Sequence, residues 1–96
     1  MRVILSERAE ADLESIADYI GRDAPQRARS FVAEIVDTCG RLYQFPERWP
    51  AAPDFGDGSR KALHGRYLIF YSIHPDCIVV DHIVHGSSQA WRLDHD

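Results

Sequence analysis

The chain has 96 residues, of which 45% are hydrophobic, 10% aromatic and 27% charged, and this composition predicts one soluble globular domain spanning residues 1–96. Its formal net charge of −4 argues against binding nucleic acid through overall charge, so no direct sequence-specific nucleic-acid binding is expected. The longest apolar run, residues 67–71, is too short to span a membrane, and the N-terminus lacks the apolar core of a secretory signal. A cytoplasmic protein with no membrane partner is therefore expected.

The first half of the chain predicts a short strand followed by two helices. Residues 2–5 are predicted to form the strand, and Ser6 to cap a helix that ends near Gly21. Pro25 suits the first turn of a second helix, which should end before Pro46. The apolar stripes of the two helices comprise Ala9, Leu13, Ile16, Ala17 and Ile20 in the first, and Ala28, Phe31, Val32, Ile35, Cys39 and Leu42 in the second. A link of about four residues makes the pair an antiparallel hairpin.

The second half of the chain predicts strands. Residues 46–59, rich in proline and glycine, should form a long loop. Beyond them the apolar period becomes two, which predicts strands at 60–64, 67–74 and 77–84. The middle strand is apolar on both sides and is expected to be covered on both. Strict alternation in the last strand places Ile78, Val80 and Val84 on one face, and Val79 and Ile83 on the other.

These elements together predict an α+β fold with the order β-α-α-β-β-β. The helical hairpin should pack on one face of a small, mainly antiparallel sheet. The first strand must join this sheet, but its neighbour is left open. Cys39 and Cys77 have neither zinc-site nor disulfide spacing, so both are expected to be reduced packing residues.

The histidines of the last strand do not predict a metal site. His82 and His85 lie three residues apart, so on a strand they point to opposite faces and cannot bind one ion. Asp81 and His85 are expected to share a face, but residues four apart stand about 13 Å from each other, too far for a catalytic relay. No metal and no other cofactor is expected.

One group of side chains near the strand ends could carry a function. It comprises Arg60, Arg66, Tyr67, His85, Trp91 and Arg92. If the strand order brings them together, the group offers planar cations, an aromatic surface and one residue that titrates near neutrality, suited to binding phosphate or a base, or to moving a proton. The alternative interpretation is structural: Tyr67 packs, the arginines pair with acids at the sheet rim, and Trp91 folds back on the core.

Several segments in order resemble the RelE/ParE superfamily of bacterial toxin–antitoxin modules. Residues 11–20 resemble its first helix, and residues 42–46 resemble its Leu-x-x-x-Pro exit from the second. Arg60 followed by residues 67–71 is similar to its Arg…Tyr-x-Ile-x-Tyr strand pair. Residues 79–86 resemble its final strand, which often ends in His-Gly. The resemblance covers residues 1 to about 93, and it implies the same fold.

The superfamily contains two activities. The RelE-like branch cleaves mRNA in the ribosomal A site, and in that case Arg66 and His85 would be the catalytic residues. The ParE-like branch inhibits DNA gyrase by binding it. The net charge of −4, the single lysine and Gly86, where some of the nucleases carry tyrosine, favour the ParE-like branch. A toxin fold with another role stays open.

The ParE-like interpretation implies a non-enzymatic toxin with two protein partners. DNA gyrase would be contacted by residues of the strand ends and tail, namely Arg60, Arg66, His85, Trp91 and Arg92. A ParD-like antitoxin would form a hetero-oligomer with the toxin by folding onto the helical hairpin. Its expected contacts are the apolar residues Leu13, Ile16, Ile20, Phe31 and Ile35.

Overall fold

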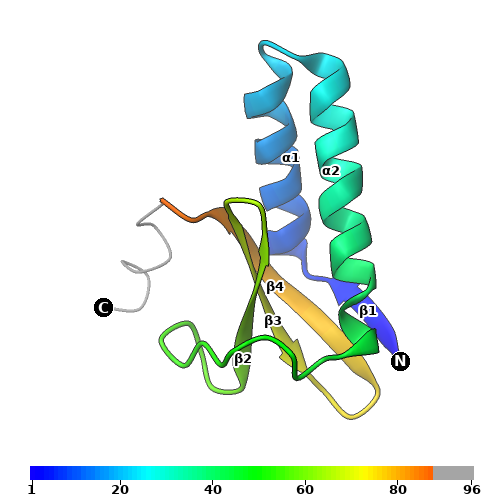
Figure 1. Cartoon of the computed structure of the whole chain (residues 1–96), viewed down its shortest axis with the longest axis vertical. Coiled ribbons are helices and arrows are strands. Elements are labelled where there is room, and N and C mark those ends of the chain that lie inside the picture. The colour runs from blue at the N-terminus through cyan, green and yellow to red at the C-terminus, as the bar shows by residue number, and fades with distance from the viewer. Residues whose placement is uncertain (88–96) are drawn as a thin grey trace.

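The computed structural model describes residues 1–87, and residues 88–96 lie outside that description. Two helices stand side by side over a four-stranded sheet (Figure 1). The elements are β1 (Arg2–Leu5), α1 (Glu7–Gly21), α2 (Pro25–Gly40), the short 3₁₀ helix η1 (Leu42–Gln44), β2 (Ser59–His64), β3 (Tyr67–Ile73) and β4 (Cys77–His85). The predicted α+β class and element order are confirmed. Within residues 1–87, no helix is long and apolar enough to cross a membrane.

A single hydroxyl group starts α1 and ties it to the sheet. Ser6 Oγ accepts the Ala9 N–H at 3.0 Å, as expected for a cap. The same hydroxyl donates to the Asp81 carbonyl of β4 at 3.0 Å. The helix therefore leaves β1 in a direction that carries it along the end of β4.

The strand order is β1-β4-β3-β2, which places β1 beside β4 in parallel. The other two pairings, β2 with β3 and β3 with β4, are antiparallel. Because β1 is short, it pairs only with residues 77–80 of β4. The second half of β4 therefore has no strand on that side, and α1 packs there instead.

A β-bulge in β4 changes which residues face the helices. Tyr71 pairs with Val80 but Phe70 pairs with His82, so Asp81 is an extra residue. Ile83 consequently joins the core on the helix side, together with Val80. The predicted faces of Ile83 and Val84 were therefore wrong, because strict alternation fails across an inserted residue.

The bulge also separates Asp81 from His85. The Asp81 carboxylate accepts a hydrogen bond from Ser72 Oγ at 3.2 Å, on the sheet face away from the helices. His85 contacts Tyr67 on the helix side, so the prediction that Asp81 and His85 share a face was wrong. His82 stacks with Phe70 on the far face, which confirms that His82 and His85 point in opposite directions. Within residues 1–87, no cluster of three metal-ligating side chains is found.

The core lies between the hairpin and the sheet, and β3 is its centre. Ile69 and Tyr71 face the helices, and Phe70 on the opposite face stacks on Phe55 of the long loop with ring centroids 4.4 Å apart. All three β3 residues are fully buried, so the prediction that this strand is covered on both sides is confirmed. Cys39 and Cys77 are free thiols, as expected, and burial raises the pKa of Cys39 to about 12.

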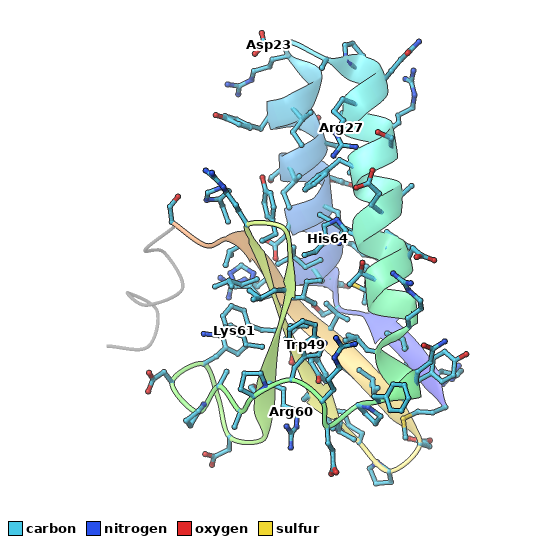
Figure 2. The ribbon with its side chains drawn as sticks, in the orientation of Figure 1. Asp23, Arg27, Trp49, Arg60, Lys61 and His64 are labelled. Carbon is cyan, nitrogen blue, oxygen red and sulfur yellow. The ribbon has the colours of Figure 1, made fainter. Side chains whose placement is uncertain are left out.

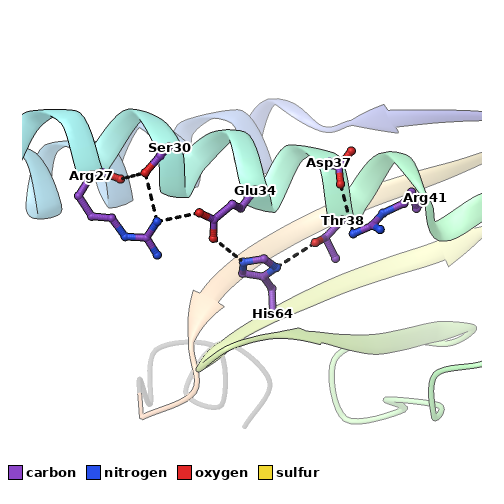
Figure 3. A network of polar contacts seen from close by, with 7 residues as sticks. All are labelled: Arg27, Ser30, Glu34, Asp37, Thr38, Arg41 and His64. Carbon is purple, nitrogen blue, oxygen red and sulfur yellow. Dashed lines mark hydrogen bonds and ion pairs between the residues drawn. The ribbon is translucent and has the colours of Figure 1, made fainter.

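A polar network fixes α2 over the edge strand β2 (Figure 3). His64 Nδ1 lies 2.9 Å from Thr38 Oγ1, and its Nε2 lies 3.6 Å from the Glu34 carboxylate. Glu34 also accepts a 2.7 Å hydrogen bond from Arg27, which lowers the pKa of its carboxyl group. These contacts join the helix to the strand next to the β2–β3 turn.

Candidate functional site

The β2–β3 turn and the end of β4 meet at one edge of the sheet, which we call the rim (residues 65–67 and 85–87). Tyr67 pairs with His85, and the Gly86 N–H donates to the Arg66 carbonyl at 2.6 Å. A Cβ atom on Gly86 would lie 3.0 Å from that carbonyl oxygen, tighter than ordinary van der Waals contact, so the close approach favours glycine. The strand order thus brings Arg66, Tyr67 and His85 together, as the functional interpretation of the sequence required.

The ring of His85 is held at the rim by Tyr67 and Ser87. The Tyr67 and His85 rings meet edge to face, with centroids 5.2 Å apart. The Ser87 N–H donates to His85 Nδ1 at 3.1 Å, and Ser87 Oγ lies 2.7 Å from the same nitrogen. An N–H donor at Nδ1 places the proton of the neutral ring on Nε2. His85 therefore has no free basic nitrogen in this arrangement.

A cleft of about 460 Å³ lies between α1 and the end of β4, and we call it the rim cleft. It is lined by Asp12, Ser15, Ile16, Tyr19, Tyr67, Ile83, Val84, His85 and Ser87. The lining includes a carboxyl group and three aromatic rings but no lysine or arginine from the described part of the chain, residues 1–87. Burial, together with the nearby Tyr19, raises the pKa of Tyr67 above the ordinary phenol value, which already leaves the group neutral at physiological pH.

One polar cluster beside the cleft was missed by the sequence analysis. Asp12 Oδ2 accepts hydrogen bonds from His82 Nδ1 at 2.5 Å and from the Ile83 N–H at 2.8 Å. Arg8 donates to His82 Nε2 at 3.2 Å, and this contact fixes the tautomer because arginine has no acceptor. The sequence signal was His82 itself, a polar residue in a strand rich in valine and isoleucine, and it was compared with His85 rather than with a helix 70 residues away.

The sequence comparison decides the family. The family model of the ParE toxin of the type II toxin–antitoxin system, parDE, matches residues 3–90. The chain belongs to this family. Among curated proteins, none matches the sequence significantly.

A solved structure supports the same fold for this ParE-family chain. The structure described as the chromosomal ParDE TA system from P. aeruginosa is similar, with a TM-score of 0.78 and 22% identity. The match covers 88% of this chain and 95% of that chain. At this level of identity the similarity shows a shared fold.

The expected gyrase contacts do not all lie together. Arg60 pairs with Tyr71, four residues along β3 from Tyr67, which places it about 13 Å from the rim. Its guanidinium donates to the Trp49 carbonyl at 2.6 Å and to the Glu47 carbonyl at 3.2 Å (Figure 2). The grouping of Arg60 with the rim was therefore wrong, as was its expected pairing with acids, because it binds loop carbonyls. Trp91 and Arg92 lie outside the described residues.

The expected antitoxin contacts lie largely inside the molecule. Leu13, Ile16 and Ile35 are buried in the core between the hairpin and the sheet. Leu13 and Ile35 contact a partner only if the hairpin opens, so the accessible part of the expected surface reduces to the half-buried Ile20 and Phe31 and to the part of Ile16 that lines the rim cleft. An apolar stripe identifies which face of a helix is buried, but it does not distinguish burial against the chain's own sheet from burial against a partner protein.

Proposed function

We propose that this chain is the toxin of a type II module and inhibits DNA gyrase by binding it. The observation that carries the proposal is the rim, where the backbone of the exposed Arg66 bonds to Gly86, the residue after a His85 ring whose Nδ1 is already occupied. An exposed arginine near an imidazole that is already hydrogen-bonded suits recognition of a partner. General-base chemistry would instead need a free ring nitrogen near the substrate proton.

The runner-up function is the ribosome-dependent nuclease, and one observation favours it. Arg66 and His85, the two residues that such an enzyme would use, do come together at the rim. Proton abstraction by His85 would require Ser87 to release Nδ1. The two functions therefore differ in whether the rim breaks a covalent bond.

An assay with the purified full chain separates these functions. We expect inhibition of plasmid supercoiling by gyrase and intact transcripts in a reconstituted translation reaction. His85→Ala should weaken inhibition by about tenfold or less, the usual loss for one interface residue. His74→Ala, at an exposed histidine in the opposite turn, serves as the control. Cleaved mRNA with unchanged supercoiling, abolished by His85→Ala, would establish the nuclease instead.

A ParD-like antitoxin is proposed as the neutralising partner. Its binding segment would cover the half-buried Ile20 and Phe31 and nearby exposed apolar groups such as Tyr19, which is 68% exposed. Burying such surface is the main driving force of protein association. Co-purification with the product of the adjacent gene tests the partnership, and slowed amide exchange on α1 and α2 in the complex tests the surface. Unchanged exchange on both helices would contradict it.

A further inference from the structure

The rim cleft presents the groups that bind a planar cation. Tyr19 of α1, Tyr67 of β3 and His85 of β4 line it with three aromatic rings. The Tyr67 phenol is neutral at physiological pH, as phenols ordinarily are, and burial raises its pKa further. A cation over such rings is attracted by their negative faces.

The charge on the α1 side of the cleft has the same preference. Asp12 Oδ2 accepts hydrogen bonds from His82 and the Ile83 N–H, and Oδ1 has no hydrogen bond among residues 1–87. The exposed acids Glu14 and Asp18 are on the same helix but do not line the cleft. Among residues 1–87, no arginine or lysine lines the cleft. A positively charged ligand is therefore complementary to the site, and an anion is not.

The edge of β4 beyond β1, which faces α1 across the cleft, gives the ligand a backbone to bind. The Ile83 N–H points away from β3, because it donates to Asp12. Two residues on, the backbone N–H and carbonyl of His85 face the same side, beyond the end of β1. Among residues 1–87 they have no backbone partner. An extended polypeptide segment can satisfy them while placing a side chain in the cleft.

We propose that the rim cleft binds an arginine side chain presented by an extended segment of the antitoxin. Arginine fits better than lysine, because its planar guanidinium stacks on tyrosine rings and donates in a fork to a carboxylate. The site is continuous with the proposed antitoxin surface, since the ring centroids of Phe31 and Tyr67 lie 5.3 Å apart. The inference rests on the proposed antitoxin partnership, but the cleft's preference for a guanidinium is measured on the toxin alone.

Two small probes that differ only in charge test the cleft in the full-length chain. Nα-acetyl-arginine methylamide should shift the NMR signals of Tyr19, Tyr67 and His85 in a saturable manner. The citrulline analogue has the same shape without the charge, and it should bind about threefold more weakly or worse. Equal affinity of the two probes, or shifts confined to the outer acidic face of α1, would overturn the proposal.

Matched variants identify the groups and the occupant. Tyr19→Leu should weaken arginine binding about threefold, whereas Tyr19→Phe should preserve it. Tyr43→Leu, the same change at an exposed tyrosine outside the cleft, should have no effect. A severalfold gain of probe affinity in Arg92→Gln would show that the chain's own C-terminal segment fills the cleft and would overturn the assignment to a partner.

The assignment to the antitoxin has a separate test. The bound antitoxin should exclude the arginine probe, and undiminished probe binding in the complex would refute its place in the cleft. If no antitoxin binds at all, the proposed partnership fails, while the probe result still stands for the cleft. Inhibition of gyrase is measured in a separate assay, so failure of the cleft proposal, of the antitoxin partnership and of gyrase inhibition can be told apart.

Discussion

Replacement of Asp12 by alanine should be the most damaging single polar substitution at the edge of the sheet. Asp12 Oδ2 is the shared acceptor for the His82 ring and the Ile83 backbone N–H. The His82 side chain is only 5% exposed and that of Asp12 is 19% exposed. Water can therefore reach the aspartate position in part, but it cannot easily reach the histidine nitrogen that loses its partner.

The expected loss follows from two hydrogen bonds to a charged acceptor. Each contributes about 1.5–3 kcal/mol, and partial access of water favours the lower end, for a total of about 3 kcal/mol. A chain of this length has a stability of about 5–14 kcal/mol, so the variant loses a substantial part of it. The corresponding fall in Tm is about 12–24 °C.

Urea unfolding followed by circular dichroism measures this loss. Asp12→Asn keeps a neutral acceptor, so it should lose about half as much. Asp18→Ala is the matched control, because it makes the same change on an exposed face of the same helix, and it should stay within about 0.5 kcal/mol of the parent. An Asp12→Ala variant as stable as Asp18→Ala would refute the role of Asp12 as the shared acceptor.

Three further outcomes are expected. Gly86→Ala should lower the free energy of unfolding by about 1–2 kcal/mol, because the new Cβ would press on the Arg66 carbonyl. Gly40→Ala, with nothing within 4 Å of the new Cβ, should raise it by about 0.5 kcal/mol. Urea unfolding of the two variants measures both changes. Burial raises the pKa of Asp81, so its carboxyl group holds a proton more tightly in the folded state than in the unfolded state. The free energy of unfolding therefore falls as the pH rises from the unfolded-state pKa of Asp81 to its folded-state pKa. Asp81→Asn should therefore become more stabilising from acid to neutral pH, and a difference in unfolding free energy independent of pH would contradict this. With Ellman's reagent, native protein should expose Cys77 to reaction while buried Cys39, with its raised pKa, reacts only after denaturation; two equally fast thiols would argue against the buried site.

Sequence periodicity was sufficient for the elements because their causes are local. Ser6 caps α1 and Pro25 begins α2, each through its own backbone chemistry. The strands lie within one residue of their predicted bounds, since alternation and turn residues act over short spans. The same logic failed in β4, where the bulge at Asp81 depends on the pairing with β3 and has no marker in the strand itself.

The site depended on contacts between distant segments. Arg60 and Arg66 are close in sequence but lie at opposite ends of β2 and its turn, and only Arg66 reaches the rim beside His85. Asp12 and His82 meet across 70 residues because short β1 leaves the end of β4 open to α1.

The sequence alone therefore determined the elements, their order and the resemblance that the family match confirmed. Tertiary structure decided the strand neighbours, the face of each side chain after the bulge and the residues that line the rim cleft. The physical reason is the sequence separation over which the interactions act. Caps, turns and periodicity act within a few residues, whereas a site forms only after distant strands and helices have paired and packed.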